Sequence, residues 1–174
     1  KAADPERFHA WATKIAPAAY VVQHKLDGAS LDLQYEGGIL VKAVTRGDGK
    51  VGDDVTENAR TIRSLPLALA ARRPGIAIPR LLEDRGQVYL PRSVFARLNE
   101  DRSRNGEEPF INPRNAASGA LKLLDSRQVA ERGLELFLYA LVRGSGGEPR
   151  THSAALALLR DLGSTNGTWI DLDR

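Results

Sequence analysis

Cysteine and methionine are absent from the 174 residues, and histidine is rare. Without cysteine the chain can form no disulfide, no thiolate zinc site and no cysteine nucleophile, which fits a reducing compartment. The three histidines, His9, His24 and His152, are not at metal-ligand spacing, so no histidine-based metal site is expected. No apolar run is long enough to span a bilayer, and no signal-peptide pattern is present. The start at Lys1 without methionine suggests a piece of something longer.

Charge and composition point to an ordinary globular domain. Hydrophobic residues make up 42% of the chain, and its length suggests one domain that can bury a core of its own. The formal charge is +3 with a pI of about 9.4, which fits a polyanionic partner without being diagnostic. The arginine pairs 72–73 and 102/104 fit a solvated surface and a nucleic-acid face equally well.

Hydrophobic periodicity and turn signals predict a mixture of helices and strands. Helices are predicted over residues 5–15, after Asp54 with Glu57 completing a capping box, over 93–104, within 112–124 and over 153–162 with Gly163 as the cap. Strands are predicted over residues 18–26, 31–35, 39–45, 88–90 and 134–141. Residues 46–49 are expected to form a loop, and 67–82 to be irregular. Since βαβ alternation is lacking, we expect an α+β fold with antiparallel sheet.

The sequence Lys-Leu-Asp-Gly at residues 25–28 carries the candidate chemistry. Residues two apart on a strand face the same side, so Gln23, Lys25 and Asp27 are expected to project together. The glycine would end the strand or let a ligand approach closely. A lysine attacks an electrophilic phosphorus only as the neutral amine, so its surroundings must favour that form. By itself the tetrapeptide is more typical of a charged pair on a surface strand.

Further blocks follow the lysine motif in a definite order. They lie at residues 45–49, 52–58, 60–63, 85–91, 109–119 and 137–139. Their order and spacing, apart from a small insertion around 71–79, resemble the adenylation domain of bacterial NAD-dependent DNA ligases over residues 1 to about 163. The resemblance implies a nucleotidyltransferase (ATP-grasp-like) fold with antiparallel sheets flanked by helices. We expect a single adenylation-domain fragment over residues 1–174, with 164–174 as a divergent tail.

The resemblance implies roles for individual residues. Lys25 would form the phosphoamide with AMP, and Asp27 would lie near the ribose and orient the lysine. Arg46 would contact the ribose, and its positive charge would favour the neutral form of the lysine. Tyr139 would stack on the adenine, although without the resemblance a core aromatic on a buried strand is the better interpretation. His24 belongs to the same expected nucleotide-binding set.

At three positions the chain differs from the residue that is usual in the family. Arg114 and Lys122 would face phosphates of NAD or nicked DNA, but most family members have arginine at the position of Lys122, and lysine lacks the planar fork. Gln23 and Gln87 stand where the family has glutamate, one near the adenine amino group and one near the sugar. Gln23 still offers a carbonyl oxygen. Loss of two carboxylates would ease deprotonation of the lysine but weaken hydrogen-bond acceptance, and such paired replacements can accompany loss of catalysis.

Several parts that the resemblance implies are not visible in the sequence. No acidic strand residue and no second lysine motif follow Gly163, and no module for the nicotinamide half of NAD precedes Lys1. The oligomer-binding fold, the zinc module and the helical DNA clamp of the family are not visible either. The chain alone is therefore expected to be weakly active or inactive and not to seal nicks.

Residues 161–169 suggest an alternative function. Their sequence, Asp-Leu-Gly-Ser-Thr-Asn-Gly-Thr-Trp, resembles a signature of forkhead-associated domains, which bind phosphothreonine peptides. Such a domain needs a loop arginine and a Ser-Arg-x-x-His stretch upstream among many short strands, and residues 151–162 instead predict a helix. A turn rich in Ser, Thr, Asn and Gly is the simpler interpretation.

Three hypotheses follow. The first is an enzyme domain that transfers AMP from NAD to Lys25, with Mg²⁺ as the metal cofactor and nicked double-stranded DNA as the partner of the whole protein. The second is a degenerate relative that keeps the nucleotide pocket or DNA surface without catalysis, and the third is the phosphopeptide module. Intact downstream motifs in the full-length gene would separate the first two, and a phosphothreonine-peptide pull-down would decide the third. We further expect a monomer in the bacterial cytoplasm, near the nucleoid, with no metal-ligating residues and no membrane contact.

Overall fold

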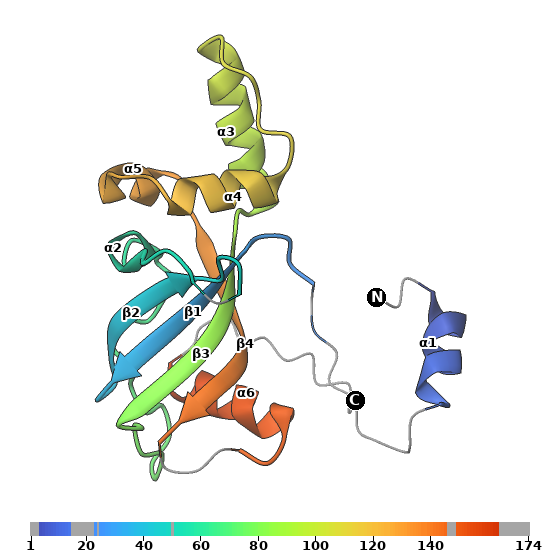
Figure 1. Cartoon of the computed structure of the whole chain (residues 1–174), viewed down its shortest axis with the longest axis vertical. Helices are drawn as coiled ribbons and strands as arrows, with labels where there is room; N and C mark the ends of the chain where they lie inside the picture. Colours follow the sequence, from blue (N-terminus) through green and yellow to red (C-terminus); the bar gives the residue numbers. More distant parts are fainter. Residues whose placement is uncertain (1–3, 15–22, 24, 50, 146–148, 164–174) are drawn as a thin grey trace.

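A four-stranded antiparallel sheet forms the centre of the molecule, as the computed structural model shows (Figure 1). The structure describes residues 4–14, 23, 25–49, 51–145 and 149–163. The sheet has the order β2-β1-β3-β4, with β1 at Ala29–Glu36, β2 at Ile39–Thr45, β3 at Leu81–Tyr89 and β4 at Glu135–Gly144. The helices are α1 (Pro5–Ala12), α2 (Thr56–Ala59), α3 (Arg92–Arg104), α4 (Pro113–Leu121), α5 (Ser126–Glu131) and α6 (His152–Asp161). The predicted α+β class with antiparallel pairing is confirmed, although the described residues form one sheet.

The hairpin of β1 and β2 follows the sequence prediction closely. Leu31, Leu33 and Tyr35 are almost fully buried and alternate with polar residues along β1, which is the pattern of a strand with one covered face. Gly37 and Gly38 between the strands both have positive φ, which glycine adopts without strain. The hydroxyl of Tyr35 donates to the carbonyl of Pro66 at 2.8 Å, so this buried polar group is satisfied.

The core lies between the apolar face of the sheet and the helices α2, α4, α5 and α6. Ala117 and Leu121 of α4 are fully buried, and Val129 of α5 and Leu159 of α6 are nearly so. In Figure 1 the helices α3, α4 and α5 gather at one end of the sheet, while α6 packs beside β4. The strand ends at the α4 end of the sheet therefore meet the helix that carries Arg114.

Two predicted elements are corrected at the N-terminal part of the chain. The helix expected over 5–15 ends at Ala12, with the side chain of Asp4 accepting from the backbone N–H of Glu6 as its N-cap. The strand expected over 18–26 lies mostly outside the described residues, and Gln23 and the segment 25–27 carry no strand pairing. Gly28 therefore precedes β1 and does not end an earlier strand.

The segment after β2 is also different from its prediction. Residues 46–49 form the expected loop, but α2 is a single turn that begins after Val55. Asp54 accepts from the backbone N–H of Thr56 at 3.0 Å and from its hydroxyl at 2.6 Å, and Glu57 pairs with Arg60. The capping box was therefore a wrong prediction, because both acidic side chains have nearer partners.

The remaining differences concern β3, β4 and α5. Residues up to 80 are irregular as expected, but β3 begins at Leu81, and β4 extends to Gly144. The short helix α5, which Asp125 caps by accepting from the N–H of Arg127, was missed. The helices α3, α4 and α6 are confirmed, and Gly163 follows α6 with a φ of 104°. The tail at 164–174 lies outside the described residues.

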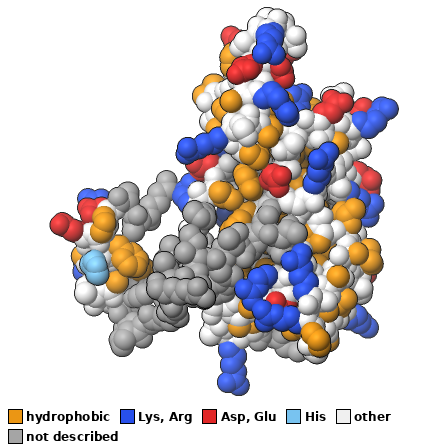
Figure 2. Space-filling view, turned by 180° about the vertical axis from the view of Figure 1, so that it is seen from behind, with side chains coloured by type: hydrophobic (Ala, Val, Ile, Leu, Met, Phe, Trp, Pro, Cys, Tyr) orange, Lys and Arg blue, Asp and Glu red, His pale blue; other side chains and the backbone are white. Residues whose placement is uncertain are grey.

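The surface arginines of α3 are paired with acids. Arg104 contacts Glu100 and Asp101, while Arg102 pairs with Glu107 and lies 4.4 Å from the ring centroid of Phe110. Figure 2 shows basic and acidic side chains side by side on this projecting helix. These pairs favour the solvated-surface interpretation of the arginine cluster. Among the described residues, no helix is long and apolar enough to cross a membrane.

Candidate functional site

The lysine motif lies in a segment without regular secondary structure that leads directly into β1. Its glycine is required by close packing: a Cβ on Gly28 would lie 1.9 Å from the carbonyl oxygen of Val88 on β3. No side chain can be accommodated against a backbone atom at that distance. The contact therefore fixes where the chain crosses β3, and with it the place of Lys25 and Asp27 at the end of the sheet.

A hollow of about 480 Å³, called here the nucleophile pocket, lies at that end. It is lined by residues 25–30 and 45–47 together with Gln87, Arg114, Ser118, Lys122 and Tyr139. The predicted grouping of Lys25, Arg46, Gln87 and Tyr139 in one cleft is therefore confirmed. The expectation that Lys25 lies at the end of a strand is corrected, since the lysine stands before β1, which begins at Ala29.

The strand register explains how distant blocks meet in this pocket. Ser30 of β1 pairs with Gln87 of β3, and Gln87 pairs with Phe137 of β4. Tyr139 lies two residues beyond Phe137 on the same strand, so its side chain is on the same face of the sheet. Arg46 follows directly after the end of β2. The pocket thus receives residues from β1, β3 and β4 and from the end of β2, at the point where the lysine segment joins them.

The pocket is electropositive. Lys25, Arg46, Arg114 and Lys122 line it, and Asp27 is the only acidic side chain among the described residues of its lining. Lys25 forms an ion pair with Asp27, and both side chains are more than half exposed. A concave site that contains several cations and few anions favours a negatively charged ligand, such as a phosphate group.

Ser30, Thr45 and Ser118 also line the pocket, and sequence analysis missed them. The hydroxyl oxygen of Ser30 is buried and has no hydrogen-bond partner among the described residues. The alternation of β1 could have placed Ser30 on the same face as Asp32. Ser118 lies within the block at 109–119, but the sequence did not single it out, because its approach to the lysine segment depends on how α4 crosses the end of the sheet.

Arg85 is a further residue that the sequence did not single out. Its guanidinium donates through Nε and Nη2 to the carboxylate of Asp32, and the second of these distances is 3.0 Å. The hydrogen bond to Asp32 raises the pKa of Arg85, and the charge of Tyr139 when ionised acts in the same direction. Arg85 is thus a fixed cation close to Tyr139 on the open face of the sheet.

Gln23 lies outside the lining of the nucleophile pocket. Its amide nitrogen donates to the backbone carbonyl of Tyr139 at 3.5 Å, and its amide oxygen lies 3.2 Å from Nε2 of His152 at the start of α6. The side chain therefore connects the lysine segment to β4 and α6. His24, its neighbour in the expected nucleotide-binding set, lies outside the described residues.

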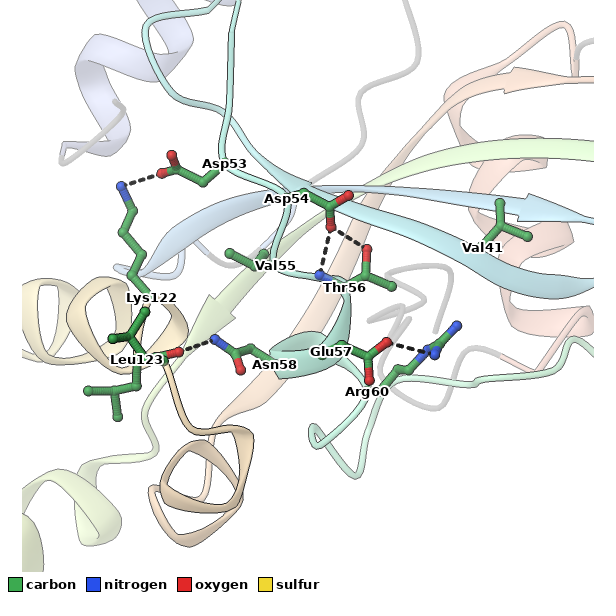
Figure 3. Close-up of a pocket in the computed structure, with 11 residues that line it drawn as sticks. Val41, Asp53, Asp54, Val55, Thr56, Glu57, Asn58, Arg60, Lys122 and Leu123 are labelled. Atoms are coloured by element: carbon green, nitrogen blue, oxygen red, sulfur yellow. Dashed lines mark hydrogen bonds and ion pairs between the residues drawn. The ribbon is translucent and has the colours of Figure 1, made fainter.

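A larger hollow of about 810 Å³, called here the outer groove, lies on the other side of Lys122 (Figure 3). Lys122 lines both hollows, and its ammonium lies 2.7 Å from the carboxylate of Asp53. The hydrogen bond from Lys122, followed by its positive charge, lowers the pKa of Asp53. The outer groove is lined by Val41, residues 53–58, Arg60 and residues 122–124.

Among the described residues, no three His, Asp or Glu side chains gather as a metal site would require. The carboxylates nearest the nucleophile pocket, Asp27 and Asp53, are each engaged by a lysine.

The pocket combines an aromatic side chain with four lysine and arginine side chains, an arrangement that suits a phosphate-bearing ligand. The chain belongs to the family of NAD-dependent DNA ligase adenylation domains, because that family's model matches residues 3–169. The match covers the whole segment at 161–169 that resembled a phosphopeptide module, and α6 occupies residues 152–161. Neither the phosphopeptide hypothesis nor the degenerate-relative hypothesis gains support.

Bacterial DNA ligases are similar to the chain over most of its length. The chain is 46% identical to a DNA ligase of Desulforamulus reducens and 48% identical to one of Carboxydothermus hydrogenoformans, with 83% of the chain and 21% of each relative covered. It is 43% identical to a DNA ligase of Oceanobacillus iheyensis over 88% of the chain and 22% of the relative. The chain thus spans about a fifth of the length of these relatives.

Proposed function

We propose that the chain is the nucleotidyltransferase-fold part of a DNA ligase, in which Lys25 accepts AMP from NAD as the first step of nick sealing. The observation that carries the proposal is the gathering of Lys25, Arg46 and Tyr139 in one electropositive pocket. The relatives are DNA ligases, and the family is one of NAD-dependent adenylation domains. A lysine in this pocket that accepts adenylate would account for both the ligase relatives and the adenylation-domain family.

The proposed step balances as a simple displacement. Nζ of Lys25, as the neutral amine, forms a bond to the phosphorus of the AMP half of NAD while the bond from that phosphorus to the bridging oxygen breaks. Nicotinamide mononucleotide leaves with the bridging oxygen, and the amine releases one proton. Asp27, the ion-pair partner of Lys25, is placed to orient the amine and to receive that proton.

The other pocket residues have roles in binding and orientation. Arg46 would contact the ribose, and Gln87 would lie near the sugar and the lysine. Tyr139 would stack on the adenine. Arg114 and Lys122 would hold phosphates of NAD or DNA, where their charges offset the charge of the phosphoryl group.

Gln23 differs from these pocket residues in its position. Its amide oxygen faces His152 and would also accept from the adenine amino group. A neutral amide accepts more weakly than a carboxylate, so we expect weaker discrimination for adenine than a glutamate would provide.

The wider setting follows from the same proposal. Nicked double-stranded DNA would be the partner of the whole protein, which we expect to act as a monomer in the bacterial cytoplasm. Mg²⁺ would bind with the phosphates of the substrate, since the described residues supply no cluster of ligands for it.

The proposal is tested by intact mass after incubation with NAD and Mg²⁺. We expect less self-adenylation of the 174 residues than of the full-length protein, because the chain spans only about a fifth of its relatives. Gln23 and Gln87, which carry no charge, should slow the step in both. The full-length protein should gain the mass of one adenylyl group, and the gain should vanish in Lys25→Ala. Adenylation of the full-length protein that persists in Lys25→Ala would refute the proposal.

A further inference from the structure

One side chain of α2 grips the backbone on both sides of Lys122. Nδ2 of Asn58 donates to the carbonyl of Leu121 at 2.9 Å. It also donates to the carbonyl of Leu123 at 2.7 Å, the bond drawn in Figure 3. Lys122 is the C-cap residue that follows the last residue of α4, Leu121. The last carbonyls of a helix have no donor within the helix, so an external amide that bonds two carbonyls there fixes the geometry of its end.

The far end of Lys122 is held as well. Its ammonium contacts the carboxylate of Asp53, 2.7 Å away. The backbone of Asp53 is fixed by Thr45, which donates its N–H to the Asp53 carbonyl at 2.9 Å and accepts the Asp53 N–H through its hydroxyl at 2.9 Å. Lys122 thus lies in the wall between the outer groove and the nucleophile pocket, with its backbone and its charge both anchored.

The two anchors differ in how easily they are released. The Asn58 bonds are half-buried and engage backbone carbonyls, so breaking them leaves polar groups without partners. The ion pair is more than half exposed on both sides, and exposed ion pairs contribute little to stability. A phosphate that enters the nucleophile pocket can therefore take the ammonium from Asp53 while the backbone stays in place.

We infer that Asn58 is a positioning residue for Lys122, and that Asp53 is the resting partner which Lys122 exchanges for a phosphate. The inference rests on the proposed function, because it assumes that the pocket binds a nucleotide. Lysine is a point charge on a flexible stem, and fixing its backbone on both sides limits the positions that the ammonium can reach. Asn58 would thus act on the phosphate through Lys122 and touch no ligand itself.

The test separates phosphate binding from binding of the nucleoside. The affinities of adenosine and AMP are measured by calorimetry on the 174-residue chain, and the ratio of the two is the contribution of the phosphate. We expect Lys122→Ala to lower this ratio several-fold and Asn58→Ala to lower it by a similar factor, with the affinity for adenosine unchanged. The double variant that combines Asn58→Ala with Lys122→Ala should have the same ratio as Lys122→Ala alone, since Asn58 acts through the lysine.

Two controls make the result specific. Asn99 also makes two hydrogen bonds to the backbone, accepting the N–H of Phe110 at 2.8 Å and donating to its carbonyl at 3.2 Å, and these bonds do not involve Lys122. Asn99→Ala should therefore leave the ratio unchanged although it loses a comparable clamp. Asp53→Asn should raise the ratio, because the competing carboxylate is removed.

A second experiment, which measures binding of a nicked DNA duplex, decides whether Lys122 contacts a phosphate of the nucleotide or a phosphate of DNA. If the phosphate belongs to DNA, Asn58→Ala and Lys122→Ala should each reduce the salt dependence of duplex binding by about one unit of slope, and leave the AMP ratio as it is. An unchanged ratio together with an unchanged slope in Asn58→Ala overturns the inference, as does an equal effect of Asn99→Ala. Absence of adenosine and AMP binding by the unaltered chain would instead refute the proposed function.

Discussion

Asp84 of β3 is buried in the core and pairs with Leu33, the neighbour of Asp32 on β1, and the charge of Asp32 acts on the carboxyl of Asp84. Asp84 is 1% exposed, and neither of its oxygens has a hydrogen-bond partner among the described residues. Burial, followed by the negative charge of Asp32, raises the pKa of Asp84 well above its usual value. Asp32 accepts a hydrogen bond from Arg85 and provides no hydrogen bond to Asp84.

This pair predicts that Asp84 makes the protein less stable as the pH rises. The carboxyl is neutral in the folded protein but ionises in the unfolded chain above the ordinary aspartate pKa of 3.8. The contribution of Asp84 to stability should therefore be greatest below that value and should fall as the pH rises towards the folded pKa. The other charged or titratable groups on this part of the sheet are Tyr35, Lys42 and Glu83.

Asp84→Leu should accordingly raise the free energy of unfolding at neutral pH by on the order of 1–3 kcal/mol, because it removes an unsatisfied buried polar group. Denaturant unfolding between about pH 4 and 8 measures the effect, and the gain should grow with pH. Asp101→Leu on the surface of α3 serves as the control and should show no such trend. A loss of stability in Asp84→Leu at neutral pH would contradict the prediction.

Gly28 provides a second prediction, on the entry to β1. Gly28→Ala should lower the free energy of unfolding by about 1–3 kcal/mol, as overpacking does, because its Cβ would meet the carbonyl of Val88. Affinity for adenosine should fall as well, since the lysine segment must move. Gly119→Ala is the matched control: nothing lies within 4 Å of its Cβ, and alanine in a helix should stabilise by roughly 0.5–1 kcal/mol. Equal effects at both glycines would refute the packing argument.

Tyr139 provides a third prediction, on nucleotide binding. Stacking on an aromatic ring contributes about 0.5–1.5 kcal/mol beyond burial, so Tyr139→Ala should weaken AMP binding several-fold. Tyr139→Phe keeps the ring and should retain most of the affinity. Calorimetry with AMP measures both, and thermal unfolding checks that each variant is folded. Unchanged affinity in folded Tyr139→Ala would remove Tyr139 from the proposed site.

Gln23 provides the fourth prediction, on the choice of base. Gln23→Glu replaces the amide nitrogen that now donates to the Tyr139 carbonyl, so the new oxygen should turn away from that carbonyl and towards the base. A carboxylate accepts more strongly from an amino group than an amide does, so binding of AMP relative to inosine monophosphate should rise several-fold. Competition binding with the two nucleotides measures the ratio. An equal change for both ligands would show that Gln23 does not read the amino group.

The sequence predicted a strand well where buried apolar residues alternate with exposed polar ones, and poorly where that alternation is broken. The hairpin of β1 and β2 was predicted well, because its buried residues alternate and two glycines stand at the turn. β3 was mostly missed, because Asp84 and Gly86 occupy buried positions where an apolar residue would have revealed the alternation. Its strand conformation comes from pairing with β1 and β4, which no local pattern records.

The candidate site was also predicted only in part from the sequence. The resemblance carried by the blocks from the lysine motif to residues 137–139 implied that Lys25, Arg46, Gln87 and Tyr139 form one group, and the structure places them in one pocket. The roles of these residues stay predictions. The sequence could not show that Lys25 precedes the strand, since the end of a strand depends on where its partner stops pairing.

The sequence by itself determined the residue types at the pocket and the amphipathic pattern that folds β1, β2, α4 and α6. Only the tertiary structure decided which distant side chains meet. Asn58 reaches the carbonyls on either side of Lys122, and Asp53 reaches its ammonium, across a long separation in the chain. Such contacts form because packing of the apolar faces brings the end of α4 against α2, and the polar groups left at that junction must then satisfy one another.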